Sequence, residues 1–261
     1  MSDVRELYHV AEAILDDAER IFIHGLGSDP ALLKEKGDFA TEYDIRIEQY
    51  LRKTLTQMTG IQVYGEECGG DQGTPMWVVD PIDGTANYAA GNPMCSILIS
   101  LVVDFQPVLG LTSVPITGQR FGAFDGSPLY INGRPQLPLE DAPRAAAHLG
   151  FSSISSPVQS SFPTEVRQGL LGVLAETYLR PRITGSVGID LAYSAAGIFD
   201  AALSLSPNIW DNAAGVMLVR AAGGKVTDLH GEEWTPESQG VVAGSARSHA
   251  LLLRAIDKLF R

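Results

Sequence analysis

Residues 97–114 contain the feature that most restricts how this chain can fold. Two apolar, β-rich runs, 97–103 and 108–114, are separated only by a short segment that begins at Asp104. Such a pair predicts a β-hairpin. Shorter runs of the same kind predict further strands over residues 61–64, 76–79, 121–124 and 129–131. We therefore expect a mostly antiparallel sheet in this part of the chain.

Two segments outside this sheet have the spacing of amphipathic helices. Apolar residues recur every three or four positions over residues 3–22 and again over residues 44–58, so each segment presents one apolar stripe to a core. From about residue 137, strand-like and helix-like runs alternate, which is typical of an α/β layer arrangement. The predicted fold class therefore combines α+β and α/β parts. We expect two halves, residues 1–136 and 137–261, that share an extended interface.

The composition of the 261-residue chain excludes several kinds of partner. Asp and Glu number 31 against 19 Lys and Arg, so the formal net charge is −12, and such a surface repels nucleic acids and anionic membranes. The longest apolar run is much shorter than the roughly 20 residues that span a bilayer. Cys68 and Cys95 form neither a CxxC motif nor a Cys/His cluster, which indicates no zinc site and no disulfide framework. We expect a cytoplasmic protein that binds neither nucleic acid nor membrane.

Several acidic residues stand at positions where each has an ordinary structural explanation. The pair Glu66 and Glu67 is typical of a solvated turn, and Asp83 followed by glycine is a common turn dipeptide. Asp211 precedes an apolar run and is a suitable N-cap for a helix over residues 211–222, as Asp44 is for the helix over residues 44–58. Taken singly, none of these acids indicates a functional site.

Residues 77–88, WVVDPIDGTANY, give the same acids a functional interpretation. Pro81 disfavours an αR conformation at Asp80 and keeps that residue extended, and a sharp turn at Asp83 then lets both carboxylates converge. Converging oxygen ligands, with the Ile82 carbonyl between them, are typical of Mg²⁺ or Ca²⁺ sites. A helix that starts at Gly84 would present free N–H groups to an anion. A metal pocket beside an anion pocket predicts phosphoryl transfer to water.

Four motifs resemble, in order and spacing, those of the inositol monophosphatase family of Mg²⁺-dependent, lithium-sensitive phosphatases. They are DFATEYD at 38–44, GEE at 65–67, WVVDPIDGTANY at 77–88 and WDNAAGVMLVRAAGG at 210–224. The similarity spans nearly the whole chain. The resemblance implies a five-layered αβαβα sandwich of the sugar-phosphatase type, usually assembled as a homodimer. It also implies an enzyme that hydrolyses a small phosphate monoester.

The resemblance further implies two or three bound Mg²⁺ ions. Their ligands would be Glu66, Asp80, the Ile82 carbonyl, Asp83 and Asp211. Because four carboxylates repel a phosphate group, divalent ions must reverse the local charge before substrate binds. Glu67 would support the site from behind, whereas Lys36 is predicted to be an ordinary surface lysine.

Catalytic roles follow from the same resemblance. Glu66 and Thr85 would orient the attacking water, and Asp44 would hydrogen-bond the Thr85 hydroxyl. The backbone N–H groups of Gly84 and Thr85 would bind the phosphate.

The leaving group is the least determined part of the substrate. The resemblance predicts substrate contacts at Asp83, Gly185, Ser186, Val187 and Ser204. In relatives that favour inositol phosphates, an acidic residue stands seven positions before the equivalent of Asp211, where this chain has Ser204. Because a hydroxyl is a weaker acceptor than a carboxylate, inositol monophosphate and a related polyol or sugar phosphate both stay open. Histidinol phosphate and fructose 1,6-bisphosphate are alternatives, and a catalytically silent metal-binding regulatory protein is a third.

Overall fold

The computed structural model describes residues 3–34, 39–141, 147–156 and 160–260. Its first two long helices, α1 (Val4–Gly25) and α2 (Glu42–Thr59), confirm the helices expected from the apolar spacing. Each follows a polar cap: the Asp3 carboxylate accepts the Arg5 N–H at 3.0 Å, and Thr41 precedes α2. Between them in the chain lies a two-stranded ribbon of β1 (Leu32–Leu33) and β2 (Phe39–Ala40).

The expected hairpin is the centre of a seven-stranded sheet. Its two strands pair antiparallel with Ile97 opposite Ser113. In spatial order the strands are β3 (Val63–Gly65), β4 (Met76–Asp83), β5 (Ser96–Val103), β6 (Gln106–Val114), β7 (Gln119–Phe124), β8 (Tyr130–Ile131) and β9 (Arg134–Pro135). β3 pairs with β4 in parallel, and the other neighbours pair antiparallel. The short helix α3 (Thr85–Ala89) follows β4, and a 3₁₀ turn, η1 (Pro115–Thr117), joins β6 to β7.

The second sheet comes from the later part of the chain and mixes parallel and antiparallel pairs. In spatial order its strands are β11 (Leu179–Arg182), β10 (Ala147–Phe151), β12 (Ala201–Ser204), β14 (Val241–Gly244) and β13 (Lys225–Thr227). The helices that alternate with them are α4 (Thr164–Ala175), α5 (Val187–Ala195), α6 (Ile209–Ala221) and α7 (Ala246–Phe260). The alternation predicted from residue 137 onwards is therefore confirmed.

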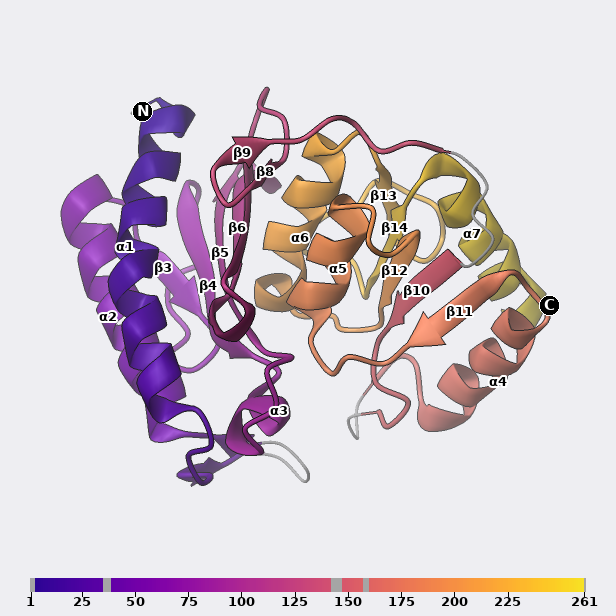
Figure 1. Cartoon of the computed structure of the whole chain (residues 1–261), viewed down its shortest axis with the longest axis horizontal. Coiled ribbons are helices and arrows are strands. Elements are labelled where there is room, and N and C mark those ends of the chain that lie inside the picture. The colour runs from indigo at the N-terminus through magenta and orange to yellow at the C-terminus, as the bar shows by residue number, and fades with distance from the viewer. Residues whose placement is uncertain (1–2, 35–38, 142–146, 157–159, 261) are drawn as a thin grey trace.

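These elements stack in five layers, as Figure 1 shows from left to right. The helices α1 and α2 cover one face of the first sheet, α5 and α6 lie between the two sheets, and α4 and α7 cover the outer face of the second sheet. The αβαβα sandwich implied by the family resemblance is confirmed. Within the described residues, none of the helices combines the length and the apolar character needed to cross a membrane.

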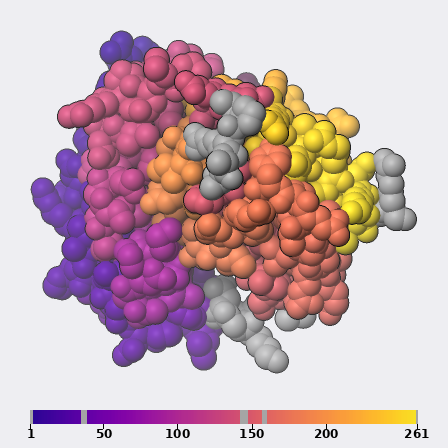
Figure 2. Space-filling view, turned by 45° about the vertical axis from the view of Figure 1, so that its right-hand side comes forward, coloured from indigo at the N-terminus to yellow at the C-terminus, as the bar shows by residue number. Residues whose placement is uncertain are grey.

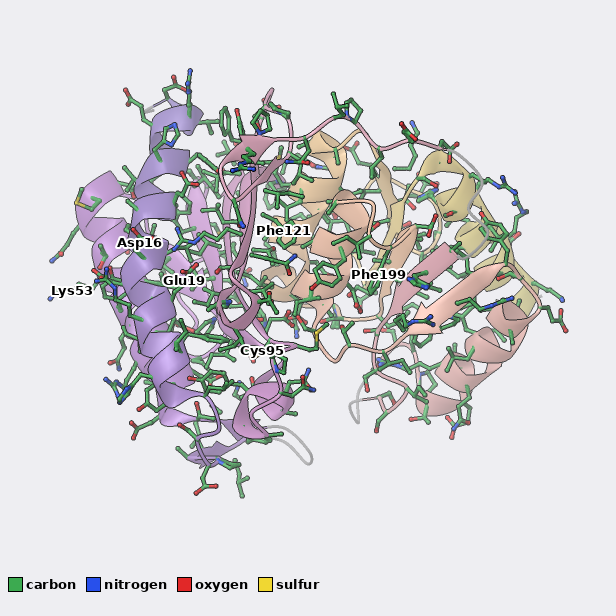
Figure 3. The ribbon with its side chains drawn as sticks, in the orientation of Figure 1. Asp16, Glu19, Lys53, Cys95, Phe121 and Phe199 are labelled. Carbon is green, nitrogen blue, oxygen red and sulfur yellow. The ribbon has the colours of Figure 1, made fainter. Side chains whose placement is uncertain are left out.

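The middle helical layer is covered on both sides, which explains why residues 213–219 of α6 are apolar or glycine and all buried. A Cβ atom at Gly215 of α6 would lie 2.4 Å from the Leu191 side chain of α5, so only glycine allows the two helices to pack this closely. Aromatic rings cross the same layer: Phe121 contacts Tyr193 at 6.1 Å between centroids, and Tyr193 contacts Phe199 at 5.4 Å. Figure 3 labels Phe121 on the first sheet and Phe199 towards the second.

The two large sheets come from different parts of the chain but share one core. Strands β3 to β9, which end at Pro135, form the first sheet, and strands from Ala147 onwards form the second. One apolar cluster nevertheless runs from Val78 of the first sheet through α5 and α6 to Ala243 of the second. Figure 2 shows the N-terminal half, in indigo to magenta, directly against the orange and yellow C-terminal half. We keep the division at residues 136 and 137 as a proposal.

Candidate active site

A β-bulge in β4 brings Asp80 and Asp83 to the same face of the first sheet. On a regular strand, residues three positions apart point to opposite faces. Here Asp80 pairs with Leu98 and Asp83 with Ser96, so three steps on β4 match two on β5. The extra residue restores a common face, in a segment where Pro81 has no N–H to contribute to the sheet. The strand β4 thus extends past the apolar residues to Asp83. The two carboxylates converge because of the bulge as well as the turn that follows it.

Four acidic side chains line one cavity of about 280 Å³. Glu66 follows β3, Asp80 and Asp83 belong to β4, and Asp211 lies in the first turn of α6. The other lining residues are Phe39, Ile82, Gly84, Thr85, Ala86, Gly185 and Asn208. The acids that the sequence singled out therefore share one site, although they come from both halves of the chain.

Oxygen atoms are the metal ligands that this cavity offers. Among the residues that the structure describes, no group of three or more His, Cys, Asp or Glu side chains has an arrangement that could hold a metal ion. The four carboxyl groups would be the ligands of a divalent cation bound here. The Ile82 carbonyl, which also lines the cavity, would add a further oxygen ligand.

Burial and mutual repulsion raise the pKa values of these carboxyl groups. Burial raises the pKa of Asp211 to about 8, with smaller contributions from the charges of Glu66 and Asp83. Burial, and then the same two acids and Asp211, hold the pKa of Asp80 well above its usual range. Burial also raises the pKa values of Glu66 and Asp83. Acids with this tendency to keep their protons indicate a cavity that lacks positive charge.

Asp83 is held from both halves of the molecule. Its Oδ2 accepts the Gly188 N–H at 2.8 Å, the Ser96 hydroxyl at 2.9 Å and the Ser186 hydroxyl. Its Oδ1 accepts the Val187 N–H at 3.2 Å. The carboxylate thus sits at the N-terminus of α5, where the helix dipole favours negative charge, and most of its hydrogen bonds fall on one oxygen.

Asp211 is not the N-cap of its helix, which corrects the alternative considered from the sequence. α6 begins at Ile209 after Asn208, so Asp211 is the third helical residue. Its Oδ2 accepts the Ser206 hydroxyl and, at 3.3 Å, the Asn208 side-chain amide. Two extra residues at the start of the helix turn the carboxylate towards the cavity instead of towards its own backbone.

Lys34 is the functional residue that the sequence did not reveal. Its Nζ lies 2.8 Å from Glu66 Oε1 and 2.6 Å from Glu67 Oε1. Partial burial acts to lower the Lys34 pKa, but the two glutamates outweigh it and raise that pKa. Lys34 thus supplies one positive charge to the acidic site. Lys36, two positions later, lies outside the described residues, and the local pattern does not distinguish the two lysines.

Glu48 was also not predicted, and it fixes the turn that carries Glu66. It is fully buried on α2, and its carboxylate accepts the N–H groups of Glu67 at 2.7 Å and Cys68 at 3.0 Å. A Cβ atom at Gly65 would lie 2.3 Å from this carboxylate, which explains the glycine of the GEE motif. The apolar spacing of α2 gave no signal for this buried acid.

Thr85, the first residue of α3, lies between two acceptors. Its Oγ1 is 3.0 Å from the Ile82 carbonyl oxygen and 3.3 Å from Asp44 Oδ1. Because a hydroxyl carries one hydrogen, it donates to one acceptor at a time. Asp44 is the third residue of α2 rather than its N-cap, and its Oδ2 accepts the Thr41 N–H at 2.7 Å. This capping box holds the carboxylate beneath Thr85, and burial raises its pKa to about 6.

The predicted leaving-group residues differ in their access to the cavity. Asp83 and Gly185 line it. Ser186 is buried, and its hydroxyl donates to Asp83 and accepts the Ile189 N–H as the N-cap of α5. Val187 contributes its backbone N–H to the same carboxylate. These last two residues therefore hold Asp83 in place.

The structure places Ser204 outside the lining of the cavity, so the substrate contact expected there stays a prediction. Ser204 is the last residue of β12, is only 2% exposed and is not among the residues that line the cavity. Its hydroxyl accepts the Ser206 N–H at 3.3 Å.

Comparison with known proteins identifies the family. The family model described as "Inositol monophosphatase family" matches residues 3–260. The chain belongs to this family. Membership makes the protein a hydrolase of phosphoric monoesters, as the resemblance of the four motifs implied.

Relatives of similar length support the same assignment. A probable inositol 1-monophosphatase ImpA of Mycobacterium tuberculosis is 46% identical over 258 residues, which cover 98% of this chain and 96% of the relative. An inositol-1-monophosphatase ImpA of Mycolicibacterium smegmatis is 45% identical over 252 residues, which cover 96% of this chain and 91% of the relative. Among solved structures, an extragenic suppressor protein suhB of Bartonella henselae superimposes with a TM-score of 0.87 at 27% identity, covering 97% of this chain and 99% of that one.

Proposed function

We propose that this phosphatase hydrolyses a small polyol or sugar phosphate with Mg²⁺ as its cofactor. The observation that supports the proposal is the shared cavity of Glu66, Asp80, Asp83 and Asp211, which adjoins the turn at Gly84. A site built from oxygen ligands suits a hard divalent cation. The turn supplies the backbone N–H groups that a phosphate needs.

The charge of the cavity fits bound cations. Its carboxyl groups have raised pKa values because burial and repulsion are not balanced by positive charge, and Lys34 supplies a single ammonium group. Two or three Mg²⁺ ions would be held by Glu66, Asp80, the Ile82 carbonyl, Asp83 and Asp211. When bound, such ions lower the pKa of water and offset the charge of the phosphate and of the leaving oxygen.

The protein's own residues position the reacting groups. Glu66 accepts a hydrogen bond from the attacking water, and the Thr85 hydroxyl aligns that water from the other side. Asp44 Oδ1 and the Ile82 carbonyl, at 3.3 and 3.0 Å, orient the Thr85 hydroxyl. The N–H groups of Gly84 and Thr85 hold the phosphate, so that positioning and electrostatics replace a covalent nucleophile.

The leaving group is received by the loop before α5. Gly185 lines the cavity beside the phosphate turn, and Ser186 and Val187 fix Asp83 as the second contact. We propose inositol monophosphate or a related polyol phosphate, as in the names of the ImpA relatives. Because Ser204 stands where relatives that favour inositol phosphates carry an acidic residue, sugar phosphates such as fructose 1,6-bisphosphate and the amino-alcohol ester histidinol phosphate are alternatives to be separated by assay.

The test is release of inorganic phosphate from a panel of phosphate monoesters, with Mg²⁺ and with EDTA. We expect turnover of polyol phosphates only with Mg²⁺, and a loss of at least about two orders of magnitude in Asp211→Asn. Asp17→Asn is the matched control, because Asp17 is an exposed acid on α1. Undiminished turnover in EDTA would refute the metal assignment, and Mg²⁺ binding without turnover of any ester would support the regulatory alternative.

Three further properties are part of the proposal: a homodimer and inhibition by lithium, which the family resemblance implies, and a cytoplasmic location, which the composition predicts. Light scattering tests the first, and phosphate release in the presence of tens of millimolar Li⁺ (a rough ceiling for such weakly bound ions) tests the second. Cell fractionation tests the third.

A further inference from the structure

Two glycine turns from opposite halves of the chain touch at the cavity. Gly84 precedes α3 and Gly185 precedes α5, and their φ angles are +85° and +81°. A Cβ atom at Gly84 would lie 3.0 Å from the Gly185 carbonyl oxygen. Because both residues line the cavity, the distance between these two backbones sets its width on this side.

Asn87 ties the two turns together from behind. Its Nδ2 donates to the Thr184 carbonyl at 2.8 Å and to the Met94 carbonyl at 2.6 Å, and its Oδ1 accepts from Asn92 Nδ2 at 3.0 Å. A Cβ atom at Gly185 would lie 2.9 Å from Asn87 Nδ2. Both amide hydrogens of Asn87 are therefore used, one of them across the boundary between the halves.

Thr184 continues this connection into α5. Its Oγ1 lies 2.7 Å from Asp190 Oδ1 and accepts the Ser186 N–H at 3.2 Å. Asp190 is a residue of α5 and is 4% exposed. The Thr184 carbonyl thus connects the loop 184–186 to α3, and the Thr184 hydroxyl connects it to α5. Gly185, the next residue, lines the cavity.

We infer that Asn87 is a positioning residue that holds the leaving-group loop at a fixed distance from the phosphate turn and thereby sets the preference for polyol leaving groups. The inference rests on the proposed function and adds a residue that does not itself line the cavity. The rate of hydrolysis of an ester depends on this distance if its leaving group contacts the loop. The rate depends on it much less if the leaving group has no hydroxyls to place against the loop.

The test compares kcat/KM for the polyol phosphate that the wild type turns over fastest with kcat/KM for 4-nitrophenyl phosphate. Asn87→Leu keeps the branching at Cγ and removes both donated hydrogen bonds. We expect the ratio of the two kcat/KM values to fall by at least about tenfold, the size of one lost hydrogen-bonded contact. An unchanged ratio, or an equal loss on both substrates, would overturn the inference.

Two other variants separate positioning from general damage. Asn92→Ala removes the partner of Asn87 Oδ1 but keeps both donated bonds, so its ratio should match the wild type. Asn87→Ala removes the same two donated hydrogen bonds with a smaller side chain, so its ratio should fall as in Asn87→Leu. If Asn87→Leu does not fold, Asn87→Ala provides the test.

Amide hydrogen exchange tests the loop without any turnover. Exchange over residues 185–188 should be at least about tenfold faster in Asn87→Leu than in the wild type, and unchanged in Asn92→Ala. Equal exchange in all three proteins would overturn the inference even if no ester were hydrolysed. Failure of the proposed function would appear in the wild type, whereas failure of this inference would appear only in the variants.

Discussion

Without metal, the protein should lose stability as the pH rises, and Asp211→Asn should reduce that loss. Burial, together with the charges of Glu66 and Asp83, raises the Asp211 pKa from 3.8 to about 8 in the folded chain. Between these values the folded protein keeps a proton that the unfolded chain releases. The stabilisation is therefore complete below about pH 4 and is lost as the pH rises through 8.

The size of the effect follows from the number of protons involved. A difference of one bound proton changes the free energy of unfolding by about 1.4 kcal/mol per pH unit. Because the cavity is open to water and salt, which screen the charges, we expect about 1 kcal/mol per pH unit between pH 5 and 8. Asn cannot titrate, and its neutral side chain also relieves repulsion on Asp80.

Urea unfolding in EDTA at pH 5, 6, 7 and 8 measures how the free energy of unfolding changes with pH in the wild type and in Asp211→Asn. The free energy of unfolding should fall with pH more steeply in the wild type than in Asp211→Asn, and the Asp17→Asn control should follow the wild type. Coincident slopes for wild type and Asp211→Asn, or a wild type that gains stability with pH, would refute the electrostatic reasoning. Added Mg²⁺ should stabilise the wild type most at pH 8, where the carboxylates are ionised.

Three other predictions concern parts of the molecule that support the site. Glu48→Gln should lower the free energy of unfolding by about 2–4 kcal/mol, because two backbone N–H groups and Arg52 lose a buried carboxylate. In the same urea titration, the control Glu42→Gln, at an exposed position of the same helix, should change that free energy little. Gly215→Ala should cost about 1–3 kcal/mol by overpacking, whereas Gly172→Ala, where a Cβ meets nothing within 4 Å, should be neutral or slightly stabilising. Lys34→Gln should tighten Mg²⁺ binding in a calorimetric titration, because the ammonium competes with the ion for the same carboxylates; weaker binding would contradict this.

Local sequence determined most of the layers. The apolar spacing of α1 and α2 and the β-rich runs of the central hairpin depend on neighbours a few positions away, so periodicity was sufficient to predict them. The DPIDGT and WDNAAG motifs identified the acids of the site, because few folds place these residues in this order. The starts of α2 and α6 were each predicted two residues too late, because Asp44 and Asp211 are also suitable N-caps, whereas the residues that precede the helices are Thr41 and Asn208.

The exact geometry of the site came only from contacts between distant segments. Pairing with β5 creates the bulge that turns Asp80 and Asp83 to one face. Packing of α2 against β3 brings Glu48 beneath the GEE turn, and pairing of β12 with β14 buries Ser204. A residue's type shows what chemistry it can perform, but sheet register and helix packing decide which side chains meet. Those depend on the apolar burial of the whole chain, which no short stretch of sequence contains.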